Sequence, residues 1–160
     1  MILVGSRALA NYCTINVADK DIDVWLPEGK LNTLPYRVDA SILPLDIIES
    51  VPIGGVDVDG VSIPTLDALY TIKCSHLGWD ILWEKHKAYT LIMEDMGASI
   101  IPDLYYKLKE YWKGQHGNKD FLSLYKTSKE FFTDNVDYTY DHDYLHELVS
   151  YPNKPVYTRC

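Results

Sequence analysis

Short apolar runs separated by turn residues occupy the first part of the chain, and apolar residues at helical spacing occupy the rest. The apolar run at 2–4 ends in Gly5-Ser6, which predicts a strand that stops abruptly and opens a short helix over 7–13. Residues 21–26 alternate polar and apolar side chains, as a strand does. The chain therefore begins with strand, helix and strand in quick succession.

More strands are predicted before residue 65. Residues 36–40 are a candidate strand, and the apolar run 41–48 is a better one, although Pro44 would remove one donor from its ladder. Alternating apolar residues over 56–63 surround an Asp-Gly pair, the dipeptide typical of a tight hairpin turn. We expect these strands to form one small mixed sheet.

Helical periodicity dominates after Thr65, which is placed to cap a helix N-terminus. Helices are predicted over 66–77, 79–96, 101–112 and 121–132. The predicted class is thus α/β (α+β), a small mixed sheet with a mostly helical C-terminal half. Gly97-Ala98 marks the clearest internal boundary, which divides a core at 1–96 from a helical region at 97–160 that packs on it. The last ten residues have no helix or strand period and no obvious end signal, so a longer natural chain is one of the alternatives.

Composition limits the range of functions. The 160 residues suffice for one domain with a substantial core, and no apolar run approaches a membrane span. Met1 leads straight into the first predicted strand, so no signal peptide is expected. The three cysteines at 13, 74 and 160 are odd in number, scattered and without metal spacing, so we expect a reduced, cytoplasmic protein. The net charge of −8 argues against a sequence-independent nucleic-acid binder, but a nucleotide carried on a metal ion is compatible with it.

Two carboxylates, Asp21 and Asp23, point to the same face of the strand predicted over 21–26. Adjacent carboxylates repel each other, and a divalent cation between them, usually Mg²⁺, removes that repulsion. Backbone N–H groups at Gly5-Ser6 would suit phosphate oxygens at the same place. The competing interpretation is a surface turn followed by an edge strand with two solvated acids.

Strand, Gly5-Ser6, a spacer and then Asp21-Ile22-Asp23 together resemble the signature of the nucleotidyltransferase superfamily. The start, Gly-Ser-Arg-Ala, is similar to that of the minimal nucleotidyltransferases and the AbiEii-like toxins. The resemblance implies that the Gly-Ser turn, with Arg7, holds a nucleoside triphosphate and that the two aspartates bind Mg²⁺ or Mn²⁺. The spacer over 7–20 is at or slightly beyond the usual upper limit of that family.

The resemblance also implies a third metal-binding carboxylate on a neighbouring strand. Asp46 is our first candidate, because it is an acid within the apolar run 41–48, and Asp39 is its rival. AbiEii-like proteins have a lysine inside the helix after the hairpin, so Lys73 is a candidate phosphate contact. A lysine that extends from a half-buried helix explains that position equally well. The following helix carries Lys85-His86 but lacks the acid that the family often has there.

Histidines form a second group of candidates. His76 and His86 are interpreted chiefly as core or groove residues, with a secondary site as the alternative. His142 and His146 would lie one helical turn apart, a spacing that can hold Zn²⁺. Three interpretations of this pair remain: a metal site, a substrate-facing acid/base cluster, or a hydrogen-bonded start of a helix.

The function expected from the resemblance is Mg²⁺-dependent transfer of a nucleoside monophosphate from a nucleoside triphosphate such as ATP to a hydroxyl of a protein, an RNA or a small molecule. Two alternatives stay open: an inactive binding module with the same fold, and a metal-dependent hydrolase or nuclease built on the histidine pair of the C-terminal stretch. A toxin–antitoxin or phage-related setting rests on analogy of fold alone. No membrane partner is expected, and the oligomeric state is open.

Overall fold

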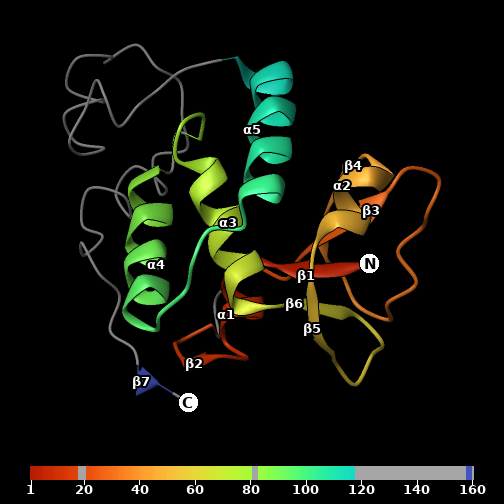
Figure 1. Ribbon diagram of the computed structural model, residues 1–160. Coiled ribbons are helices and arrows are strands. Elements are labelled where there is room, and N and C mark those ends of the chain that lie inside the picture. Colours follow the sequence, from red (N-terminus) through yellow and green to blue (C-terminus); the bar gives the residue numbers. More distant parts are fainter. Residues whose placement is uncertain (18–20, 81–82, 118–157, 160) are drawn as a thin grey trace, which may run out of the picture.

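A mixed five-stranded sheet is the centre of the fold in the computed structural model, which describes residues 1–17, 21–80, 83–117 and 158–159. The strand order is β4-β3-β1-β6-β5 (Figure 1). The strands are β1 (Ile2–Val4), β3 (Asp23–Pro27), β4 (Asp39–Leu43), β5 (Ile53–Val56) and β6 (Ser62–Pro64). Helices fill most of the described C-terminal half, so the predicted α+β class with a small mixed sheet is confirmed.

The central strand β1 pairs with a different partner on each side. It runs antiparallel to β3, with Val4 opposite Asp23, and parallel to β6. Strand β4 runs parallel to β3, so that Asp39 lies opposite Asp23. The predicted hairpin is formed by β5 and β6, and Gly60 has a φ of 80° in the turn between them.

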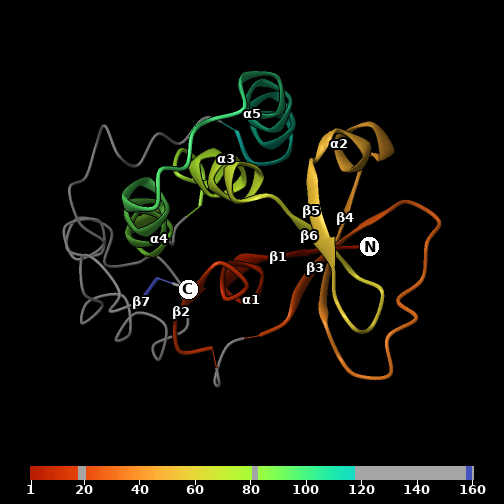
Figure 2. The same cartoon turned by 60° about the horizontal axis from the view of Figure 1, so that its bottom comes forward.

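Helices α3, α4 and α5 lie together beside the sheet, with α3 between the other two (Figures 1 and 2). The five helices of the described region are α1 (Gly5–Leu9), α2 (Leu45–Ser50), α3 (Leu66–His76), α4 (Trp83–Asp95) and α5 (Pro102–His116). Thr65 caps α3 as predicted, because its Oγ1 accepts a hydrogen bond of 3.2 Å from the N–H of Ala68. Pro102 starts α5, also as predicted.

The core consists of two clusters, and α3 contributes to both. One cluster joins a face of the sheet, including Trp25, to Leu108 and Trp112 of α5. The other joins Val24 on the opposite face to α1 and to Ile92 of α4. Ile72 of α3 packs in the first cluster and Leu69 in the second. The helix is therefore held on two sides, which fixes the polar residues at its C-terminal end.

The strand predicted over 41–48 is wrong in its second half. β4 ends at Leu43, and residues 45–50 form α2. Pro44 lacks the N–H that would continue the ladder and lies just before the helix. Asp46 is an exposed residue in the first turn of α2, where its charge favours the helix N-terminus.

Smaller differences concern the ends of elements. Helix α1 begins at Gly5 and is followed by β2 (Cys13–Thr14), which pairs with β7 (Thr158–Arg159). Helix α4 begins at Trp83, later than predicted. The helix predicted over 121–132 lies outside the described residues. None of the described helices is both long and apolar enough to cross a membrane.

We predict that Thr65→Ala lowers the free energy of unfolding by about 0.5–2 kcal/mol, because the N–H of Ala68 would lose its acceptor. Urea unfolding measures the change. Thr65→Ser keeps the hydroxyl and should retain most of the stability. Equal losses in both variants would show that the methyl group of Thr65, and not the cap, stabilises α3.

Candidate functional site

Asp23 lies against the turn in which β1 passes into α1. Gly5 forms that turn with a φ of 74°, a backbone conformation that residues with a side chain rarely adopt. A Cβ at Gly5 would lie 2.9 Å from Oδ2 of Asp23. The missing side chain of Gly5 thus leaves the space that the Asp23 carboxylate occupies, and the structure brings these two predicted site residues together.

Two further carboxylates lie near Asp23. Asp39 is its direct neighbour across the parallel pair of β3 and β4, and the N–H of Asp39 donates a 2.8 Å hydrogen bond to the carbonyl of Ile22. Asp21 precedes β3 and is exposed. Asp21 and Asp39 both line a surface hollow of about 250 Å³ together with Arg37. Asp23 lines a separate cavity, so the three aspartates lie at one end of the sheet but in two different hollows.

The protonation of Asp23 depends on the charged groups around it. Burial raises the pKa of the Asp23 carboxyl above its usual range. Lys73 opposes the rise in pKa, and the carboxylates of Asp39 and Asp21 add to it. Such repulsion between neighbouring acids is the condition that a bound divalent cation relieves.

Asp23 and Gly5 line a cavity of about 240 Å³ whose opposite wall comes from α3 and α4. Lys73, on α3, is one of the lining residues, and its Nζ lies 3.2 Å from Nδ1 of His86 on α4. The ammonium also lies 5.1 Å from the centre of the Tyr89 ring. Lys73 thus stands between the acidic end of the sheet and a group of histidines.

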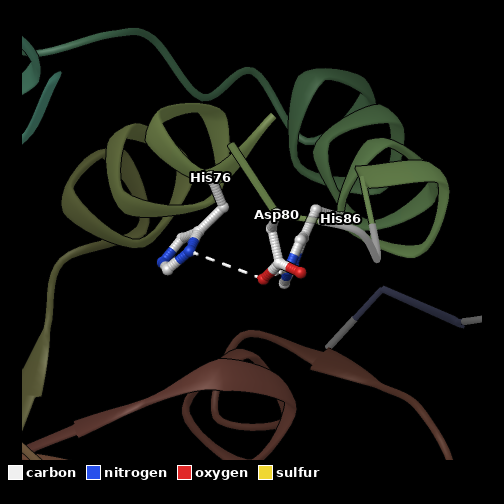
Figure 3. A group of neighbouring side chains, drawn as sticks. All are labelled: His76, Asp80 and His86. Atoms are coloured by element: carbon white, nitrogen blue, oxygen red, sulfur yellow. Dashed lines mark hydrogen bonds and ion pairs between the residues drawn. The ribbon is translucent and has the colours of Figure 1, made fainter. Parts of the chain in front are cut away.

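Three side chains form a compact cluster in the same cavity: His76 near the end of α3, Asp80 just after it and His86 near the start of α4 (Figure 3). Nε2 of His86 lies 2.8 Å from Oδ2 of Asp80, and Nδ1 of His76 lies 3.9 Å from the same oxygen. One ligand atom from each of the three side chains lies within 4.8 Å of the others. We call these three residues the His–Asp–His cluster.

Both histidines of the cluster favour the neutral form. Burial lowers the pKa of His76 well below its usual range, and the nearby His86 lowers it further. Burial also lowers the pKa of His86, with Lys73 as the next cause, while the hydrogen bond to Asp80 opposes the change. Neutral imidazoles keep a lone pair on one ring nitrogen, which can accept a proton or bind a metal ion.

The other predicted site residues lie elsewhere. Ser6 is buried and Arg7 half-buried in α1, and neither lines the cavity. Asp46 lies on α2 and does not line it either. Asp39 does not line the cavity either, but strand register places Asp39, and not Asp46, directly opposite Asp23. His142 and His146 lie outside the described residues.

Sequence reasoning missed Asp80 altogether. Its spacing of four residues from His76 was the available signal, because such pairs meet on one side of a helical turn. A larger cavity of about 630 Å³ lies between α3, α4 and α5, with Lys87, Lys109 and Glu94 among its lining residues. We locate the chemistry at the smaller cavity, because the carboxylates of Asp23 and Asp80, the Lys73 ammonium and two imidazoles line it.

The fold and site define an α+β protein with an acidic sheet end next to a His–Asp–His cluster. Residues 68–160, more than half of the chain, match the family described as Domain of unknown function (DUF7275), and the chain belongs to that family. The matched segment includes Lys73 and the whole His–Asp–His cluster. Comparison with the curated proteins gave no match, and comparison with the solved structures gave none either.

We predict that Asp23→Asn raises the metal-free stability at pH 7 by about 0.5–2 kcal/mol, the scale of relieving strain at a functional site. An acid whose folded-state pKa is raised stabilises the fold only below its unfolded pKa and loses that contribution as the pH rises through the folded pKa. Asparagine imitates the protonated form, so the gain should vanish below about pH 4. Denaturant unfolding of both proteins in EDTA at the two pH values measures this.

Asp46→Asn is the matched control, because this exposed acid lies in the first turn of α2. This variant should instead have a free energy of unfolding that is lower by about 0.3–1 kcal/mol at pH 7, because the helix N-terminus loses a favourable negative charge. A clear loss in Asp23→Asn at pH 7 would contradict the prediction. The Asp23 carboxylate would then serve chiefly as an ion-pair partner that stabilises the fold.

Proposed function

We propose that this protein is a Mg²⁺-dependent nucleotidyltransferase that moves a nucleoside monophosphate from a nucleoside triphosphate to a hydroxyl acceptor. Asp21, Asp23 and Asp39 are the proposed metal ligands, so Asp39 takes the role first considered for Asp46. The observation that carries the proposal is the placement of the Asp23 carboxylate against Gly5, with Asp39 directly opposite on β4.

The donor set suits Mg²⁺. All three side chains offer carboxylate oxygens, the hard ligands that this ion prefers. The raised pKa of Asp23 is partly due to the other two acids, so a divalent cation would be attracted by all three charges. When bound, Mg²⁺ would neutralise phosphate charge and make the acceptor hydroxyl more acidic.

The protein's own groups would position the substrate. Gly5 has no side chain in its part of the cavity wall, so a phosphate group held by the metal ion could approach the Gly5 backbone beside the Asp23 carboxylate. Lys73 adds a positive charge to the opposite wall, which suits a triphosphate. This arrangement needs few residues, because catalysis of phosphoryl transfer consists mostly of positioning and charge neutralisation.

In the proposed reaction the acceptor oxygen bonds to the α-phosphorus, and the bond from that phosphorus to the bridging oxygen of the β-phosphate breaks. Pyrophosphate leaves with the electron pair. Asp39 is exposed, unlike Asp23, and lies directly opposite it, so we assign to Asp39 the role of accepting the proton of an entering hydroxyl. The acceptor is a protein, an RNA or a small molecule; the net charge of −8 favours the first and last.

We predict that Mg²⁺ with the correct nucleoside triphosphate stabilises the protein, by about 2.7 kcal/mol at a ligand concentration a hundredfold above the dissociation constant. Asp39→Asn should lose nearly all of this stabilisation, because one metal ligand is gone. Asp46→Asn should keep it, since that residue lies on α2, beyond the end of β4 that is opposite to Asp39. Thermal melts with and without each Mg²⁺–nucleotide measure the effect.

Transfer itself is tested by incubating the protein with each α-labelled triphosphate, Mg²⁺ and a cell lysate. Label that becomes attached to a macromolecule or small molecule with wild type and Asp46→Asn, but not with Asp39→Asn, supports the proposal. Stabilisation without labelling would indicate a binding module that has lost turnover. Absence of both effects with all four nucleotides would refute nucleotidyl transfer.

A further inference from the structure

The His–Asp–His cluster has the ligand set of a transition-metal site. It offers two imidazole nitrogens and one carboxylate oxygen from His76, Asp80 and His86. Zn²⁺ and its neighbours among the first-row metals prefer this mixture, whereas Mg²⁺ prefers oxygen ligands alone. We propose that the cluster binds one Zn²⁺-class ion, separate from the acidic site on the sheet.

The distances are close to those of such a site. Ligand bonds to Zn²⁺ are roughly 2.0–2.2 Å long, so neighbouring ligand atoms of a tetrahedral ion are about 3.4 Å apart. The nitrogen–oxygen distances to Asp80 are 2.8 Å from His86 and 3.9 Å from His76, on either side of that value. Small side-chain rotations would therefore bring the three atoms around one ion. The fourth position would face the cavity, as at zinc sites with three protein ligands.

His76 provides an independent reason for a bound ion. Its Nδ1 is buried and has no hydrogen-bond partner among the described residues. Leaving such an atom without a partner costs about 1–3 kcal/mol. Aromatic rings hold the imidazole in place, with the Trp79 ring centre 4.9 Å away, that of Trp112 5.2 Å away and that of His86 5.0 Å away. The nitrogen is thus kept in place facing Asp80, and an ion between them would satisfy it (Figure 3).

Lys73 opposes metal binding, because its ammonium occupies the imidazole of His86. In the metal-free protein the Lys73 ammonium donates to Nδ1 of His86, so the proton of His86 is on Nε2 and points to Asp80. A metal ion on Nε2 moves that proton to Nδ1, where it would face the ammonium. Lys73 must then turn away from His86. The ion and the Lys73 ammonium therefore compete for one imidazole.

The test uses the full chain, stripped with EDTA and titrated with Zn²⁺ by calorimetry and with Co²⁺ by visible absorption. We expect one equivalent of either ion, with Co²⁺ bands of a nitrogen- and oxygen-ligated tetrahedral site. Asp80→Asn and His86→Gln should weaken binding by about 10–100-fold or more. His116→Gln is the control, because this histidine stacks on Trp79 and lies outside the cluster.

Lys73→Gln separates a metal site from a hydrogen-bonded cluster. Glutamine removes the ammonium and offers an oxygen to the proton on Nδ1, so metal affinity should rise about tenfold, whereas Lys73→Arg should not raise it. Far-UV circular dichroism verifies that each variant is folded. Three results would each overturn the proposal: no Zn²⁺ bound by the folded wild type, sulfur-to-cobalt charge transfer, or metal lost in His142→Ala but kept in His86→Gln. The titration needs no nucleotide or turnover, so its failure is distinct from failure of the transferase proposal.

Discussion

A half-buried carboxylate against a bare backbone turn is the contact on which the site depends. The Asp23 carboxylate can lie there only because Gly5 has no side chain and adopts a positive φ. The pairing of Val4 with Asp23 fixes this contact from the sheet side, and the pairing of Asp23 with Asp39 brings a second acid to the same place. The fold accepts the cost of burying and crowding these charges, which is how functional sites commonly differ from the rest of a protein.

Helix α3 connects that acidic end to the rest of the molecule. Three of its side chains, spaced by four residues, accept hydrogen bonds from beyond α4: Asp67 from the Ser99 N–H at 2.9 Å, Thr71 from the Ile101 N–H at 2.9 Å and Ser75 from the Trp112 Nε1–H at 3.1 Å. This polar stripe fixes α5 and the segment before it. Lys73 and His76, on another side of the same helix, line the cavity. One helix therefore both anchors the C-terminal half and supplies the cavity with its polar groups.

Local signals in the sequence predicted much of this arrangement. The Gly-Ser turn, the Asp-Gly hairpin and the capping Thr65 each depend on residues close together in the chain. All three are present, although the helix after Gly-Ser covers Gly5–Leu9 and not residues 7–13. The apolar run at 41–48 was misinterpreted, because a short apolar run has no period that separates a strand from a buried helix. The choice between Asp39 and Asp46 as the third carboxylate depends on strand register, which local sequence patterns do not reveal. The role of Asp80 depends on how the chain turns between α3 and α4. The sequence therefore indicated His76 and His86 as candidates but not Asp80.

Three of the four tryptophans form a continuous aromatic group that reaches the site. The Trp25 and Trp112 ring centres are 6.3 Å apart, those of Trp112 and Trp79 are 4.9 Å apart, and Trp79 contacts His76. At such separations excitation energy passes readily from one indole to the next. The fluorescence of this tryptophan group should therefore respond to changes at His76, which belongs to the His–Asp–His cluster. Events in the cavity can be followed optically without an attached label.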